Sequence, residues 1–273
     1  MASHSRKVEQ YYDENTKLLV NLGHSFEGTI HRAVWGPGTQ SRKDALLYVE
    51  NLIAERVPER KAEPPRQAHV VDLGCGVGAT LCRLASRLGV RGTGITISSS
   101  QVSLAQSRLV AAGVDESVKC ILGDFCDLPD CIPRADVAYA IESFVLGSDP
   151  RAFFSSCSQL VRPGGLLIIC DDFLRSAALL TDPKASVWLN RFRQGWVLGS
   201  LVDSRQLGAL AAEQGFTHIE SIDLSSYLEL GRPRDRLIGV LMRAFGWLPI
   251  RGSYWSMLYG GHALQVALRR DYL

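Results

Sequence analysis

The chain has 273 residues, of which 46% are hydrophobic and 21% charged, and its 30 basic and 28 acidic residues give a formal net charge of +2. Disordered chains combine low hydrophobicity with high net charge, so this composition excludes them and predicts a substantial apolar core. The 24 Arg and 6 Lys are scattered along the chain, and we expect no binding to nucleic acid because no basic cluster matches a phosphate backbone.

The seven cysteines form no C-x-x-C pair and have no histidines at zinc-finger spacing. This pattern predicts reduced thiols and no metal site. The N-terminus leads into polar residues, and nowhere do about 18 apolar residues follow one another. We therefore expect a soluble, cytoplasmic protein without a membrane partner.

The N-terminal part of the chain contains no convincing strand. Ser41-x-x-Asp44 is a capping-box pattern, and Val49 and Ile53 continue one apolar face, which predicts an amphipathic helix. Residues 1–35, rich in aromatic residues and histidine, are expected to form a shorter helical cap.

Short apolar runs then alternate with helical patterns, which is typical of a parallel sheet with helices on both faces. We expect buried strands at residues 69–73, 93–97, 118–122, 136–140 and 166–170.

Capping signals place the helices between these strands. Gly89 and Gly113 are positioned to end helices, whereas Ser98 and the pair Asp149-Pro150 are positioned to begin them. Each strand is therefore expected to lead into or follow a helix, as in successive βα units.

The C-terminal part departs from this rhythm. We expect an aromatic helix around residues 188–196, a capped helix from Asp203 to Gly215, and two further strands at 218–224 and 264–268. The predicted fold is α/β: a Rossmann-like, seven-stranded sheet with helices on both faces, an N-terminal helical cap and C-terminal insertions.

No Pro/Gly/Ser-rich linker separates two cores, so we expect a single domain spanning residues 1–273. It divides into the cap (1–60), a cofactor-binding core (66–172), and acceptor-side helices with the last two strands (173–273).

The most informative segment is the glycine-rich turn of residues 70–79, with the sequence VVDLGCGVGA, which joins a strand to a helix. Glycines allow a ligand to approach the backbone closely, and the helix start offers N–H donors. The turn also fits the dinucleotide fingerprint, but residues 94–98 lack the acidic residue that a nicotinamide site carries. Asp72 before the turn suits a ligand with an ammonium group, and Asp124 suits an adenine amino group.

These motifs, with Gly-Ile-Thr-Ile-Ser ahead of Gln101, Ile141-Glu142-Ser143 and the run LVRPGG, resemble class I S-adenosylmethionine-dependent methyltransferases. The missing ribose-binding acid is typical of one branch, which includes sterol and isoprenyl diphosphate C-methyltransferases and cyclopropane synthases. The N-terminal motif of residues 11–35 resembles bacterial natural-product members. The whole chain is similar to enzymes that methylate a prenyl chain and so start a terpene cyclisation.

The resemblance implies S-adenosylmethionine as cofactor and assigns residues to its parts. Gly74 and Gly76 would line the methionine moiety, and Tyr12 and Trp35 would close the cap over it. The remaining expected cofactor residues are Asp72, Thr96, Gln101, Asp124, Phe125 and Ile141. Gln101 can equally be the far half of the Ser98 capping box.

Methylating an alkene leaves a carbocation, which aromatic faces and one carboxylate can stabilise. Glu142 follows a strand at the edge of the sheet where ligands of open α/β sheets bind, and we expect it to be the catalytic residue. It would remove a proton or stabilise the cation; a solvated residue at a strand end is the alternative.

We expect a small, apolar, prenylated acceptor and leave open whether the protein is a homo-oligomer. Trp188, Phe192 and Trp196 stand at helical spacing, a pattern that is typical of core packing but also allows these rings to line the acceptor pocket. The expected acceptor-binding residues are Tyr11, His24, Phe26, Trp188, Phe192 and Trp196.

The predicted function is therefore C-methylation of a carbon–carbon double bond in a prenyl or terpenoid compound. One alternative is O- or N-methylation of a secondary metabolite, with His24, His31 or His262 as base; the other interpretation of these three histidines is a structural role. Another is an isoprenyl diphosphate C-methyltransferase. Arg232, Arg234 and Arg236 could bind a diphosphate, and a solvated loop is the other interpretation of these arginines. The missing acid disfavours a nicotinamide oxidoreductase, and a cofactor sensor without enzyme activity remains open.

Overall fold

A five-stranded parallel sheet lies at the centre of the computed structural model, which describes residues 2–22, 28–58, 67–245 and 253–273. The strand order is β3-β2-β1-β4-β5, and every pairing is parallel. This arrangement confirms the predicted Rossmann-like α/β core. The strands are β1 His69–Leu73, β2 Arg91–Thr96, β3 Val118–Leu122, β4 Ala135–Ile141 and β5 Val161–Cys170.

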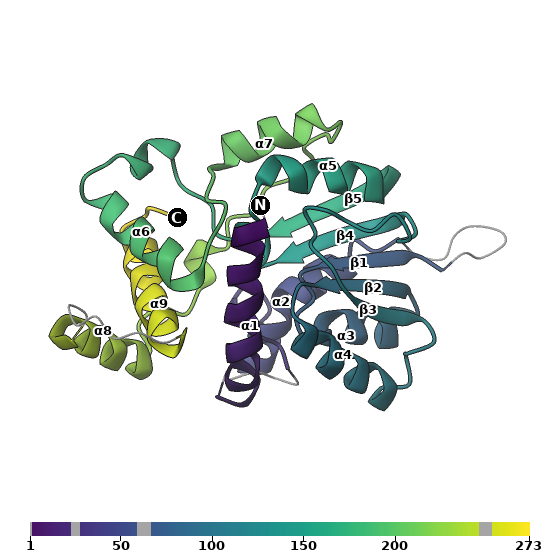
Figure 1. Ribbon diagram of the computed structural model, residues 1–273, viewed down its shortest axis with the longest axis horizontal. Coiled ribbons are helices and arrows are strands. Elements are labelled where there is room, and N and C mark those ends of the chain that lie inside the picture. Colours follow the sequence, from purple (N-terminus) through teal and green to yellow (C-terminus); the bar gives the residue numbers. More distant parts are fainter. Residues whose placement is uncertain (1, 23–27, 59–66, 246–252) are drawn as a thin grey trace.

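Helices cover both faces of the sheet (Figure 1). On one face lie α2 (Arg42–Ala54), α3 (Ala79–Leu88) and α4 (Ser99–Ala111), and on the other lie α5 (Pro150–Leu160) and α7 (Ser204–Glu213). A buried apolar cluster fills the space between the sheet and the helices on each face. β1 is fully buried along its length, which explains its continuous apolar sequence.

The predicted caps begin and end these helices. The Ser41 and Asp44 side chains form the reciprocal capping box of α2, and Ser98 accepts a hydrogen bond from the Gln101 N–H at the start of α4. Asp149 caps α5, which begins at Pro150. The glycines that end α3 and α4 are Gly89 and Gly113, with φ of +63° and +66°, a region that glycine adopts at little cost.

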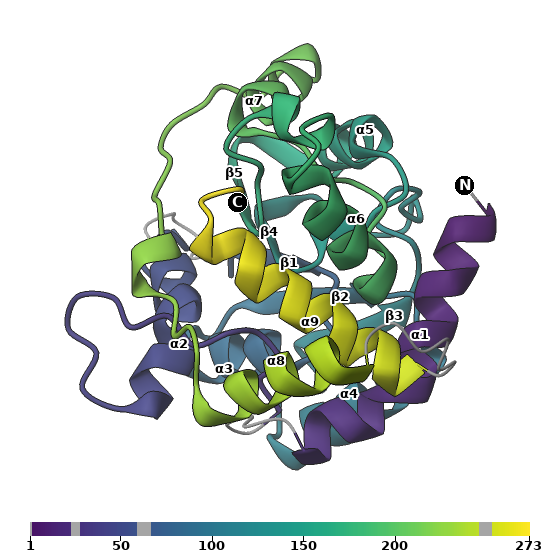
Figure 2. The ribbon, with the colours of Figure 1, turned by 90° about the vertical axis from the view of Figure 1, so that its left-hand side faces the viewer.

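The remaining helices gather beyond the carboxyl ends of the strands. In Figure 1, α1 (Ala2–Leu22) stands between the sheet and a group formed by α6 (Ala185–Trp196), α8 (Pro233–Phe245) and α9 (Ser253–Arg269). Figure 2 shows α9 crossing in front of the strands. None of the described helices is both long and apolar enough to cross a membrane. Short 3-10 helices occupy Phe144–Leu146, Ala177–Leu180 and Ser225–Tyr227.

The prediction of two further strands was wrong, because the sheet of the described residues has five. Residues 264–268 belong to α9, where Leu264 and Ala267 are buried at helical spacing. Residues 218–224 are irregular, and Ile219 is 77% exposed. A short apolar run fits a strand and a helix equally well. Here the segment is helical because it packs against α6.

Helices α6 and α9 approach each other closely through two glycines. A Cβ atom at Gly195 would overlap the backbone of Gly260, and one at Gly260 would overlap the Trp196 indole. The Trp196 Nε1–H donates a hydrogen bond of 3.1 Å to the Met257 carbonyl. This contact fixes the indole against α9.

Candidate functional site

A pocket of about 620 Å³ opens where the carboxyl ends of β1 and β4 meet the helices beyond the sheet. Its walls come from α1, the loop of residues 28–33, the glycine-rich turn, and α6, α8 and α9. Strands β1 and β4 are neighbours although β2 and β3 separate them in the chain. This is the switch point at which open α/β sheets bind ligands.

Most of the expected cofactor residues line this pocket. The exception is Trp35, whose side chain is 38% exposed and lies outside the lining. Trp35 follows Val34, which forms an isolated bridge with Leu228, so its backbone is held by that segment instead. The expected cofactor residues found in the lining are Tyr12, Asp72, Gly74, Gly76, Thr96, Gln101, Asp124, Phe125 and Ile141.

The glycine-rich turn has the backbone that only glycine adopts easily. Gly74 has a φ of +99° and Gly76 a φ of +52°. A Cβ atom at Gly74 would overlap the side chain of Ser143. The Ser143 hydroxyl donates a 2.5 Å hydrogen bond to the Leu73 carbonyl and so links the ends of β1 and β4. The turn thus leaves its backbone open to a ligand on the pocket side.

Helix α1 is fastened to the start of α4 beside the pocket. The Ser98 hydroxyl donates to Asp13 at 2.5 Å. The Gln101 amide donates to Thr16 at 3.1 Å and accepts from the Thr96 hydroxyl at 2.6 Å. The side chain of Gln101 therefore lies toward α1 and the pocket, while its backbone N–H serves the Ser98 cap.

Asp72 is a buried carboxyl group at the base of the pocket. The Tyr139 hydroxyl donates a 2.8 Å hydrogen bond to it. Burial raises the pKa of Asp72 to about 7, and this effect outweighs the hydrogen bond from Tyr139. The negative charge of Asp72 is therefore poorly compensated within the protein, and a cationic group in the pocket would stabilise it.

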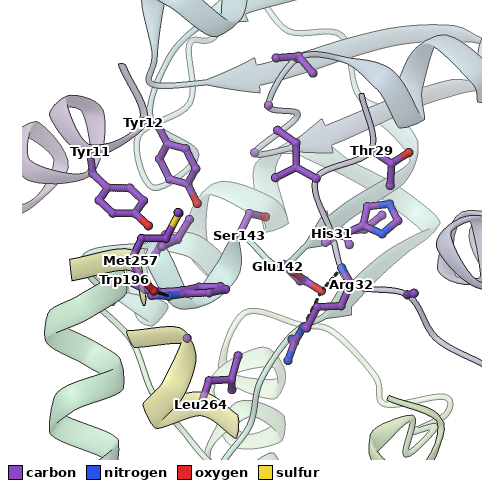
Figure 3. Close-up of a pocket in the computed structure, with 18 of the residues that line it drawn as sticks. Tyr11, Tyr12, Thr29, His31, Arg32, Glu142, Ser143, Trp196, Met257 and Leu264 are labelled. Atoms are coloured by element: carbon purple, nitrogen blue, oxygen red, sulfur yellow. Dashed lines mark hydrogen bonds and ion pairs between the residues drawn. The ribbon is translucent and has the colours of Figure 1, made fainter. Parts of the chain in front are cut away.

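Glu142 lies in the pocket as a paired carboxylate (Figure 3). Its backbone has a φ of +50°. One carboxylate oxygen accepts hydrogen bonds from the Arg32 backbone N–H at 3.0 Å and from Arg32 Nε at 2.9 Å. Arg32 also donates to Asp172 at 3.0 Å. Burial alone would raise the pKa of Glu142, but the charge and hydrogen bonds of Arg32 hold it below its usual value.

His31 is the neighbour of Arg32 and also lines the pocket. Both ring nitrogens are buried and have no hydrogen-bond partner. Burial lowers the pKa of His31, although the charge of Glu142 acts in the opposite direction. The imidazole is therefore largely neutral near pH 7, and its ring nitrogens have no hydrogen-bond partner within the described residues.

Two ionic networks hold the loop that carries His31. On one side is the bond of Arg32 to Glu142. On the other side, Arg83 donates to the Thr29 hydroxyl at 2.8 Å and pairs with Glu50 at 2.7 Å. The backbone around His31 is thus fixed while its ring stays unpaired.

Of the expected acceptor residues, Tyr11 and Trp196 line the pocket. Phe192 is completely buried in the core, and Trp188 packs edge-on against His262 with ring centroids 5.8 Å apart. Neither belongs to the pocket lining, and both pack in or against the core, as the helical spacing of the stripe favours. His24 and Phe26 lie outside the described residues.

Sequence reasoning missed the partner of Glu142 and one wall of the pocket. Arg32 lies in the N-terminal aromatic motif, but its link to Glu142 spans 110 residues and has no local signal. Part of the wall from α9, residues 264–268, was predicted as a strand, although the lining positions of this helix recur every three to four residues. They are Met257, Leu258, Gly261, His262, Leu264, Gln265 and Leu268. Among the described residues, no group of three or more His, Cys, Asp or Glu side chains could hold a metal ion.

Comparisons with known proteins agree with this architecture. Residues 70–165 match the family described as "Methyltransferase domain". An O-methyltransferase of Aspergillus nomiae is 31% identical over 218 residues, which cover 80% of this chain and 92% of that protein. An O-methyltransferase of Aspergillus sclerotiorum is 31% identical over 217 residues, covering 80% and 78%.

A solved structure shares the fold at low sequence identity. It is the geranyl diphosphate C-methyltransferase from Streptomyces coelicolor A3(2), in complex with Mg²⁺, geranyl diphosphate and S-adenosyl-L-homocysteine. The TM-score is 0.68 at 16% identity, over 98% of this chain and 94% of that one. The present chain belongs to the class I S-adenosylmethionine-dependent methyltransferases, and S-adenosylmethionine is its cofactor.

Proposed function

We propose that this protein is an O-methyltransferase of a small, largely apolar acceptor, with His31 as the base that receives the proton of the acceptor's hydroxyl group. The observation that carries this proposal is the neutral imidazole of His31, which is buried in the pocket without a hydrogen-bond partner. The two fungal relatives named O-methyltransferases support it.

The residues beside the glycine-rich turn fit the cofactor. Asp72 would hold its ammonium group, the backbone of Gly74 and Gly76 would lie against its methionine part, and Gln101 and Asp124 would bind its ribose and adenine. The uncompensated charge of Asp72 and the position of Gly74 and Gly76 in the pocket lining favour this placement. When bound, S-adenosylmethionine supplies a methyl group on a positively charged sulfur.

A neutral hydroxyl oxygen is a weak nucleophile, and this is the obstacle to its methylation. His31 removes the obstacle by acting as a base. A buried, neutral imidazole can accept the hydroxyl proton as the oxygen gains its methyl group. The nearby carboxylate of Glu142 favours the protonated ring, since its charge raises the pKa of His31. Arg32 holds Glu142 in place and is a positioning residue.

A second candidate is C-methylation of a prenyl double bond. The rings of Tyr11, Tyr12 and Trp196 line the pocket and would shelter a carbocation. Glu142 would be its counter-charge, but Arg32 already neutralises that carboxylate. An isoprenyl diphosphate is less favoured as the acceptor. Nε of Arg232 lies 3.4 Å from a carboxylate oxygen of Asp235, so this arginine is already paired within the protein.

The base is tested with phenols of graded acidity, from a methylphenol to a nitrophenol. In His31→Gln, kcat/KM for the methylphenol should fall by about a hundredfold or more, the range of general-base catalysis. It should fall only slightly for the nitrophenol, whose hydroxyl ionises without help. His262→Gln, which changes a second histidine of the pocket, should show no such dependence on acidity. An equal loss in His31→Gln for every phenol would contradict the role of His31.

A further inference from the structure

The described part of the chain has four buried side-chain polar atoms without a hydrogen-bond partner. They are both ring nitrogens of His31, Nε of Arg42 and Oε1 of Gln265. All three residues line the same pocket. Buried polar groups are almost always paired in native proteins, because desolvation without a new hydrogen bond is unfavourable. Their concentration in one pocket points to a ligand that supplies the missing partners.

Gln265 belongs to the wall that α9 contributes. Of its neighbours in this wall, Gly261, Leu264 and Leu268 have no polar side-chain atoms, and His262, which does, forms no hydrogen bond with Oε1 of Gln265. In Figure 3, α9 and the strands lie on opposite sides of the labelled side chains. The glycine-rich turn follows β1, so the wall formed by α9, to which Gln265 belongs, is separate from the wall that carries the proposed cofactor residues Asp72, Gly74 and Gly76.

We propose that Gln265 determines acceptor specificity by accepting a hydrogen bond from a second donor group of the acceptor. This proposal rests on the proposed function and names the acceptor class: a largely apolar compound with one hydroxyl group at His31 and a second hydroxyl or amino group at Gln265. The amide oxygen is only an acceptor, and no donor of the described residues, His262 on the same wall included, forms a hydrogen bond with it. An acceptor without the second donor would leave this oxygen unpaired, and such sites reject analogues that lack the matching group.

The test uses two naphthalenes of similar shape that differ in one donor. 2,7-Dihydroxynaphthalene has two hydroxyl groups, whereas 7-methoxy-2-naphthol replaces one with a methoxy group that cannot donate. Binding to protein saturated with S-adenosylhomocysteine is measured by quenching of tryptophan fluorescence, since Trp196 lines the pocket. This readout requires no methyl transfer.

The wild type should bind the diol about tenfold more tightly than the methoxy compound, a difference of about 1.4 kcal/mol. Gln265→Met keeps a similar side-chain size without the amide, and it should bring the ratio close to one by weakening binding of the diol alone. Leu264→Met alters the same face without removing a polar group and should keep the preference.

Three results would overturn the role of Gln265: equal affinities in the wild type, an unchanged ratio in Gln265→Met, or no binding of either compound. Failure of the proposed function is distinguishable, because it shows in the acidity dependence of His31→Gln turnover. A Gln265-dependent preference would survive that failure.

Discussion

His31 and Glu142 differ in their surroundings, and this difference decides which can act as a base. Glu142 was predicted as the catalytic residue because it follows β4 at the ligand-binding edge of the sheet. In the structure its carboxylate accepts two hydrogen bonds from Arg32 and has a lowered pKa, so it takes up a proton less readily than a free carboxylate. A catalytic role for Glu142 stays a prediction, and its contacts fit a counter-charge that holds the loop of His31.

Asp72 should make cofactor binding depend on pH. Its pKa of about 7 reflects burial, and only the ionised form pairs with an ammonium group. Between pH 8 and pH 6 the free protein gains a proton at Asp72, so the affinity for S-adenosylhomocysteine should fall by about tenfold. Calorimetry at both pH values measures this change, and Asp72→Asn should bind weakly with little pH dependence.

5′-Methylthioadenosine is the matched control because it lacks the amino-acid part of the cofactor. Its affinity should change little between pH 8 and pH 6. If it shows the same tenfold change as S-adenosylhomocysteine, Asp72 does not bind the ammonium group.

The crossing of α6 and α9 shapes the acceptor wall. Gly260 allows the Trp196 indole to lie against α9, so Gly260→Ala should displace the indole and lower the melting temperature. Binding of 2,7-dihydroxynaphthalene should be lost, while binding of S-adenosylhomocysteine should persist because the glycine-rich turn is unaffected. Thermal unfolding and fluorescence titration measure these effects.

Gly208→Ala is the control for the loss of a glycine in a helix. A Cβ atom at Gly208 in α7 meets no other atom within 4 Å, so this variant should be as stable as the wild type or slightly more so. A Gly260→Ala protein with unchanged stability and naphthalene binding would show that the close crossing does not shape the pocket.

Elements with strong local signals were predicted well. The bounds of β1 and β3 are those expected, and the caps at Ser41, Ser98 and Asp149 begin helices as predicted. The error at residues 264–268 has a physical cause, since a short apolar run has no distinct period and its partner α6 lies some 70 residues earlier in the chain. Tertiary packing against α6 therefore determines the secondary structure of residues 264–268.

The two halves of the pocket differ in how far sequence reveals them. The cofactor half is built mainly from contiguous motifs at the ends of β1, β2, β3 and β4, with Tyr12 from α1, and nine of its ten expected residues line the pocket. The acceptor half joins the N-terminal loop of His31 to α9 near the C-terminus. The buried polar atoms of His31, Arg42 and Gln265 that have no hydrogen-bond partner can be recognised only in the three-dimensional structure. The single-domain organisation, the oligomeric state and the resemblance to prenyl C-methyltransferases stay predictions.

The atom that receives the methyl group distinguishes the two candidate functions for the whole molecule. The protein is incubated with S-adenosylmethionine carrying a ¹³C-labelled methyl group and a panel of phenols and prenylated indoles, and the products are examined by mass spectrometry and NMR. We expect the label on oxygen, as a methoxy signal whose formation requires His31. A label bonded to carbon, formed equally well by His31→Gln, would contradict O-methylation and favour the prenyl C-methyltransferase.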